Sequence, residues 1–239
     1  MATPCLENKP LQAYQFIPVE ICLIPVFLFL IIISVSCQST EKAYYSDGKP
    51  KFIIPKDSRG KIDGEAKWWY ENGSLMLTAD YKNGLINGKM IRFHNNGNKQ
   101  SEDHYLQGKL EGLSQEMDLN GNVYSEKTYV NGTMNGISRQ FNGIGQLIEE
   151  GNYKDGYFDG EWRYFDQFGK LIATANFNHG SGVKKTWHAN GKIAKTTEYS
   201  DNLVDGTETL YDESGQKVRI RKYMTGEIVS ERPVQPGEQ

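Results

Sequence analysis

The amino-acid sequence predicts an all-β protein: an elongated, solenoid-like antiparallel sheet of stacked 24-residue hairpin repeats, preceded by an N-terminal hydrophobic helix. Three observations predict this fold. Glycine occurs 25 times and aromatic residues make up 12% of the 239 residues, which favours short strands joined by tight turns. Beyond the N-terminal stretch, aliphatic residues never recur with the period of an amphipathic helix. From Gly64 onward the chain aligns with itself at a fixed spacing, as in proteins built from repeats.

Residues 1–37 are predicted to be a signal peptide with a lipobox-like end, or a membrane anchor. The stretch Ile21–Cys37 is uncharged, and its length suits either a short spanning helix or the apolar part of a secretory signal. Its small residues directly before Cys37 resemble a bacterial lipoprotein signal, which implies lipid attachment at Cys37. A simple membrane anchor and a buried core helix are the alternatives. Both membrane readings place the protein at a membrane, with the body exported into a bacterial cell envelope.

Residues 38–63 are predicted to be a linker with an N-terminal cap. Tyr45–Gly48 resembles half of a repeat, and Lys51–Pro55 is expected to cover the first edge of the sheet. At the other end, residues 230–239 are expected to form a disordered tail.

Seven repeats are predicted between residues 64 and 229. Each opens on a glycine, which we count as position 0: Gly64, Gly88, Gly112, Gly136, Gly160, Gly182 and Gly206. The spacing is 24 residues except after Gly160, where it is 22 because two residues are missing behind the last glycine of that unit. Since a single hairpin is marginally stable, the units are expected to stack edge to edge.

Two positions of the unit carry the predicted repeat core. Position 5 is bulky: Trp69, Phe93, Phe141, Phe165, Trp187 and Tyr211, with Met117 in the remaining unit. Position 17 is always aromatic: Tyr81, Tyr105, Tyr129, Tyr153, Phe177, Tyr199 and Tyr223. Position 11 is usually aliphatic. Because 5, 11 and 17 are all odd, they are expected on one face of the sheet, with the even positions solvated.

Each unit is expected to contain two glycine-marked turns. Position 9 is always glycine and often follows asparagine, as in Asn72–Gly73, which predicts positive φ at both residues. Position 20 is glycine in six units and Asn202 in the seventh. Because asparagine tolerates positive φ better than other residues with a side chain, Asn202 is expected to keep its turn.

The residues Tyr153, Gly156 and Gly160 reproduce the MORN repeat pattern of Tyr, two residues, Gly, three residues, Gly. With the second aromatic residue and the Asn–Gly pair, the unit resembles the bacterial variant of MORN found in antitoxins of the YwqK type. The resemblance covers residues 64–229. It implies an elongated antiparallel sheet that serves as a scaffold or binding surface.

Composition and spacing predict no catalytic, cofactor-binding or metal site. Lys+Arg 27 against Asp+Glu 30 gives no basic footprint for nucleic acid. All three cysteines lie at or before Cys37, so the repeats lack thiolate ligands. His94 and His188 share position 6 but lie four units apart, and they are expected to be solvated beside their turns. The carboxylates Glu149 and Glu150, and those at position 23, are expected to be solvated turn residues.

The resulting functional prediction is a non-enzymatic, membrane-tethered repeat scaffold that binds a protein partner through its β-sheet surface. The expected partners are a protein and a membrane, the latter through the N-terminal segment or a lipid on Cys37, with no nucleic acid and no cofactor. Three alternatives stand beside it: an antitoxin-like inhibitor, an envelope structural or lipid-contacting protein, and an enzyme with an unrecognised site.

Overall fold

The computed structural model describes residues 39–235 and residue 237. Within them the chain forms one antiparallel β-sheet of eighteen strands and no helix, which confirms the predicted all-β fold. The strands are β1 (Ser39–Tyr44), β2 (Pro50–Lys56), β3 (Gly64–Trp69), β4 (Leu75–Lys82), β5 (Leu85–Phe93), β6 (Lys99–Leu106), β7 (Lys109–Leu110), β8 (Gly112–Met117), β9 (Val123–Val130), β10 (Thr133–Phe141), β11 (Leu147–Lys154), β12 (Tyr157–Phe165), β13 (Leu171–Asn178), β14 (Ser181–Trp187), β15 (Ile193–Ser200), β16 (Leu203–Tyr211), β17 (Lys217–Met224) and β18 (Glu227–Pro233).

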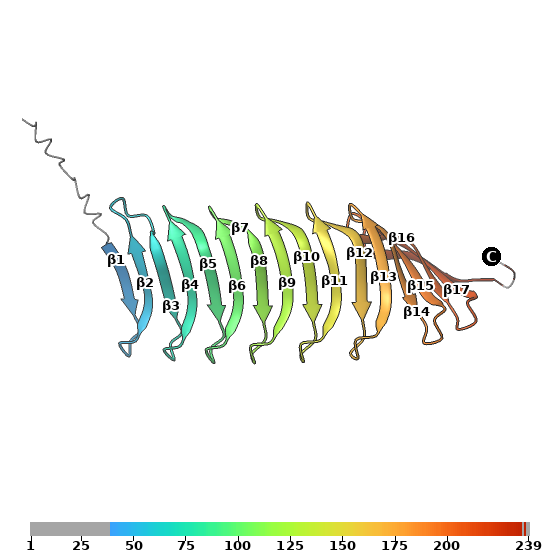
Figure 1. The fold of residues 1–239 in the computed structure, drawn as a ribbon, viewed down its shortest axis with the longest axis horizontal. Helices are drawn as coiled ribbons and strands as arrows, with labels where there is room; N and C mark the ends of the chain where they lie inside the picture. The colour runs from blue at the N-terminus through green and yellow to red at the C-terminus, as the bar shows by residue number, and fades with distance from the viewer. Residues whose placement is uncertain (1–38, 236, 238–239) are drawn as a thin grey trace, which may run out of the picture. The chain divides into compact units, whose positions relative to one another are not determined.

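Strands pair in chain order. β1 pairs with β2, β2 with β3, and so on to β17 with β18, while β6 pairs with both β7 and β8. Figure 1 shows the strands following one another side by side along the sheet. The described part of the chain is therefore a meander in a single layer, and neither face of its sheet is covered by a helix.

The seven predicted repeats are seven hairpins with one shared register. In each unit position 0 pairs with position 17, position 2 with position 15, and position 4 with position 13. The interval 38–63, predicted as a linker and cap, contains the hairpin β1–β2, which pairs with β3 through Phe52 and Trp68. At the other end β18 runs past residue 229 to Pro233. The first part of the segment predicted as a disordered tail is therefore a strand.

A one-residue bulge shifts the pairing of the two strands of each unit between position 4 and position 5. Trp68 pairs with Leu77, but Trp69 pairs with Leu75, and the same shift occurs in all seven units. Because neighbouring residues of a strand point to opposite faces, Trp69 faces away from the side that Trp68 and position 17 share. Positions 5 and 11 thus share one face and position 17 lies on the other. This corrects the prediction of a single face, since a bulge reverses the odd–even alternation.

Two kinds of turn alternate along the sheet. In the turn that ends a unit, two consecutive residues have positive φ, such as Asn83 (54°) and Gly84 (87°), which is the geometry that suits the twist of a hairpin. In the first turn of a unit only the glycine has positive φ: Gly73 has a φ of 91°, whereas Asn72 is not in the left-handed region. The prediction of positive φ at both residues of Asn72–Gly73 is therefore wrong. A three-residue loop that closes on a glycine explains the difference.

The unit that opens at Gly160 joins the next unit without a bulge. Elsewhere the ladder skips residues around the opening glycine, so that Ala79 pairs with Met90 but Tyr81 pairs with Ile86. Between β13 and β14 the register is continuous, with Phe177 opposite Gly182. The two residues missing from this unit are therefore those that form the bulge. In Figure 1, β14 to β17 are tilted relative to the strands before them.

Asn202 bridges the turns on both sides of this short unit. Its φ of 66° confirms the prediction that asparagine keeps the turn. Its backbone N–H donates to the Gly180 carbonyl, 3.1 Å away. Its side-chain Oδ1 accepts a hydrogen bond from the Phe158 N–H at 2.7 Å, and its Nδ2 donates to the Gly156 carbonyl at 2.9 Å. Asn202 thus ties the β15–β16 turn to the β11–β12 turn.

The predictions for the N-terminus lie outside the described residues. These are the hydrophobic helix, the signal or anchor in residues 1–37, and lipid attachment at Cys37. Among the residues that the structure describes, no helix has the length and apolarity needed to span a membrane.

Candidate binding face

One face of the sheet carries the aromatic residues of position 17, and we call it the tyrosine face. It comprises repeat positions 0, 2, 4, 13, 15 and 17, which share a side through their direct pairing. In every unit the position-17 ring lies opposite the opening glycine. Across the next strand it meets an apolar side chain, as Tyr81 meets Ile86 and Tyr153 meets Phe158, except in the short unit, where Phe177 meets Gly182. Glycine leaves the ring room to lie against the backbone, so one row of rings follows the sheet.

The predicted core residues are only partly shielded from solvent. Of the thirteen aromatic residues predicted at positions 5 and 17, Phe177 is buried, with 3% exposed, and the other twelve are half-buried. A single-layer sheet has no second layer to cover either face, so its side chains shield one another only sideways. The rings therefore serve both as packing and as accessible surface.

The most buried part of the tyrosine face is an aromatic corner on β11 to β15. Trp162 is 1% exposed and packs with Phe177 and Ala175, with Tyr153, Phe158, Tyr164 and Tyr199 around them. The Trp162 ring centroid lies 4.7 Å from that of Phe158 and 5.3 Å from that of Tyr153. Its Nε1 donates to the Asn152 carbonyl at 3.1 Å. Gly151 makes room for the ring, since a Cβ there would lie 2.0 Å from Trp162.

Charged groups border this corner on the same face. Lys184 Nζ lies 3.3 Å from the centroid of the Tyr164 ring. Burial raises the pKa of the Glu149 carboxyl and lowers the pKa of the Lys184 amine, and the attraction between their charges opposes both shifts. Burial also raises the pKa of Tyr153 to about 12. Shifted titratable groups beside apolar surface are frequent at functional sites, so the corner is the best candidate for the centre of one.

The repeat core predicted from the sequence does not contain Trp162, Gly151, Glu149 or Lys184. These residues occupy positions 2, 15 and 13, where the seven units differ from one another. The pattern that the repeats share does not mark such positions. The sequence does mark Trp162 in another way, as a difference between units: only the unit that opens at Gly160 has tryptophan at position 2.

The opposite face is polar in the middle of the sheet. Glu126, Arg139, Glu150 and Arg163 form a row of ion pairs, with nitrogen–oxygen distances of 3.6, 3.6 and 2.6 Å. Such partly exposed pairs contribute roughly 0–1 kcal/mol each. Glu149 and Glu150 thus lie on opposite faces and cannot act together on one substrate.

The histidines of position 6 hold neighbouring units together. His94 Nε2 lies 3.0 Å from the Met117 carbonyl, and His188 Nε2 lies 2.9 Å from the Tyr211 carbonyl. Both rings are half-buried, which corrects the prediction of solvated side chains. The reason is that position 6 reaches the next unit's backbone. No cluster of three metal-ligating side chains occurs among the described residues.

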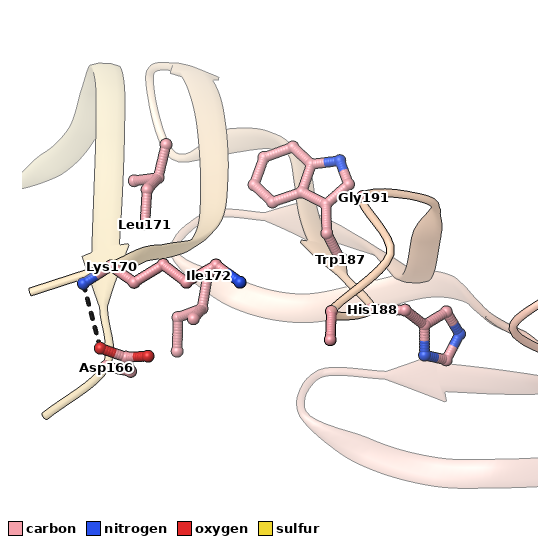
Figure 2. A pocket seen from close by; sticks show the side chains of 8 residues that line it. Asp166, Lys170, Leu171, Ile172, Trp187, His188 and Gly191 are labelled. Atoms are coloured by element: carbon pink, nitrogen blue, oxygen red, sulfur yellow. Dashed lines mark hydrogen bonds between the residues drawn. The ribbon is translucent and has the colours of Figure 1, made fainter. Parts of the chain in front are cut away.

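A hollow of about 550 Å³ lies between the β12–β13 turn and the start of the β14–β15 turn. Figure 2 shows Leu171, Ile172 and Trp187 around it, with the His188 ring directed away from them. Asp166 accepts a hydrogen bond from the Lys170 N–H at 3.0 Å, which fixes one wall. The lining is mostly apolar, with Asp166, Lys170 and His188 at its border.

Comparisons with known proteins give one family. A family model described as a MORN repeat variant matches residues 62–83, 86–107, 110–131, 158–179 and 181–201. No curated protein matches the chain. Among solved structures, a chain of the Tc holotoxin pore of Photorhabdus luminescens is similar at 12% identity, with a TM-score of 0.21. The match covers 82% of this chain and 14% of that one, so this chain spans a small part of the pore protein.

Proposed function

Five segments of the chain match the MORN repeat variant. From this premise we propose that the chain is a non-enzymatic scaffold that binds a protein partner across the tyrosine face. A membrane tether at its N-terminus would hold it in place. The observation that carries the proposal is the row of half-buried aromatic side chains on a sheet that no other element of the described residues covers.

Aromatic side chains suit this role because they offer large contact areas with few rotatable bonds. They are enriched at protein interfaces, where one part of the ring is packed and another is available to a partner. Along the tyrosine face, positions 4 and 13 add polar side chains such as Glu116 and Gln140 beside the rings. Apolar centre and polar border together have the character of a protein-binding surface.

Capture of the C-terminally tagged full chain from crosslinked intact cells, followed by mass spectrometry, tests this function. We expect one protein at near-equal amount. Its recovery should fall about tenfold in the variants Gln140→Arg and Lys127→Glu, which change the charge of the tyrosine face. A tenfold loss corresponds to roughly 1.4 kcal/mol of binding energy. Ile137→Arg, on the opposite face and 49% exposed, is the matched control and should bind normally.

Three other outcomes can be distinguished from the expected one. Equal loss in all three variants would indicate general damage and would contradict a face-specific interface. A diffuse set of envelope proteins and lipids would replace the scaffold with a structural or lipid-contacting role. A toxin as the single partner would support the finer resemblance to antitoxins of the YwqK type.

The tether is proposed from the uncharged stretch Ile21–Cys37. With a lipid on Cys37, a fatty-acid probe should label the protein, and Cys37→Ala should abolish the label. Cys22→Ala is the matched control and should leave labelling unchanged. Membrane association that persists in the unlabelled Cys37→Ala protein would favour the simple anchor, and a fully soluble native protein would overturn both models.

A further inference from the structure

The sequence contains nine Asn–Gly pairs, at asparagines 72, 83, 87, 96, 120, 131, 135, 142 and 190. Such a pair is chemically labile. The glycine backbone nitrogen attacks the asparagine side-chain carbonyl carbon, ammonia leaves, and a cyclic succinimide forms. Water then opens the ring to aspartate or isoaspartate. The reaction requires the side chain to swing toward the following nitrogen, so hydrogen bonds that hold the amide oppose it.

Eight of the nine amides are held in the structure. At three first turns the amide is held twice. Asn96, for example, accepts from the Asn98 N–H at 3.0 Å and donates to the Leu119 carbonyl of the next unit at 2.8 Å. Asn72 and Asn190 make the same two contacts in their own turns. The other five are Asn83, Asn87, Asn131, Asn135 and Asn142, each with at least one side-chain hydrogen bond.

Asn120 is the exception. It is exposed, and its side chain makes no hydrogen bond to any residue that the structure describes. The cause is the residue at position 6 of its unit. Asp118 Oδ1 accepts from both the Asn120 and Asn122 N–H groups, at 2.8 and 2.9 Å. The Asn122 N–H, which would otherwise hold the asparagine amide, is therefore already taken.

We propose that Asn120–Gly121 is the deamidation site of the folded protein, selected from nine chemically equivalent pairs by the way its turn is capped. Among the four pairs at first turns the backbone is not the discriminator, because Gly73, Gly97, Gly121 and Gly191 have φ between 85° and 91° and each donates to the carbonyl of position 6. The hydrogen bonds of the asparagine side chain are what differ.

Modification at this turn reaches the neighbouring unit. Isoaspartate places an extra methylene in the backbone beside Leu119, whose carbonyl accepts from Asn96 and Asn98 at 2.8 Å. Either product also adds a negative charge close to Asp118. Both changes weaken the link between two consecutive turns of the sheet.

Peptide mapping by mass spectrometry after incubation of the full chain at mildly alkaline pH tests the proposal. Asn120 should deamidate about thirtyfold faster than Asn96, the matched site one unit away, because two hydrogen bonds hold the Asn96 amide and each bond of ordinary net strength corresponds to a factor of about five. In concentrated urea the two sites should react at similar rates, since the fold no longer distinguishes them.

Two variants complete the test. Asp118→His restores the arrangement seen at His94 and should slow the reaction at Asn120 about fivefold by freeing the Asn122 N–H for the amide. Gly121→Ala should suppress the product, which confirms the peptide assignment. Equal rates at Asn96 and Asn120 in the folded protein, or a faster reaction at Asn96, would overturn the proposal.

Discussion

Replacement of Trp162 by alanine is expected to lower the free energy of unfolding by about 3–5 kcal/mol. Trp162 is 1% exposed and is the largest fully buried side chain of the described residues. The variant loses the ring contacts with Tyr153, Phe158 and Phe177, and it leaves the Asn152 carbonyl without the indole donor. Equilibrium unfolding in urea, followed by circular dichroism, measures the loss.

A double-variant cycle with Gly151 separates this contact from general damage. Gly151→Ala places a Cβ 2.0 Å from a Trp162 ring atom and should destabilise the native protein. In the Trp162→Ala background the same change should cost little, because the ring is absent. Two losses that simply add would show that Trp162 and Gly151 do not pack together. A loss below about 1 kcal/mol for Trp162→Ala would also contradict its burial, given the usual cost of truncating a buried tryptophan.

Replacement of Asn202 by alanine is expected to cost about 2–4 kcal/mol. Two side-chain hydrogen bonds contribute roughly 0.5–1.5 kcal/mol each, and alanine in the left-handed region costs roughly a further 1 kcal/mol. The variant leaves the Phe158 N–H and the Gly156 carbonyl without their Asn202 partner. Thermal and urea unfolding of the full chain measure the effect.

Glycine at the same position separates the two contributions. Asn202→Gly keeps the turn geometry but loses the bridge, so it should cost about 1–3 kcal/mol, the sum of two ordinary hydrogen bonds. Gly226→Asn is the matched control. It introduces asparagine at the same repeat position, where a Cβ meets nothing within 4 Å, and should change stability little. Asn202→Ala and Asn202→Gly proteins as stable as the native chain would show that the bridge carries no weight.

Both changes act on the same part of the sheet, from β11 to β16, where the short unit lies. In a repeat protein each unit contacts mainly its neighbours, so the loss should be local and distant units should keep their pairing. Partner capture by these variants would then report whether the aromatic corner is the centre of the binding surface. The face variants Gln140→Arg and Lys127→Glu lie on β10 and β9, outside the Trp162 packing.

The sequence by itself determined the repeat and its strands. The spacing of the glycines located all seven hairpins, because strand pairing in a meander depends on local turns and on neighbours in the chain. It also identified position 17 as a row, and Asn202 as a turn residue with positive φ, since both follow from residue type at a fixed repeat position. The family comparison agrees over five of these units.

Only the tertiary structure decided which side chains act together. The bulge after position 4 placed position 5 and position 17 on opposite faces, and odd–even counting cannot detect an inserted residue. Trp162 became the centre of the core because Gly151, on the neighbouring strand, leaves room for its ring. His94, Asn96 and Asn202 were fixed by bonds to carbonyls in other units. Such contacts depend on how neighbouring units stack. A repeat pattern alone does not contain the distances between side chains of different units.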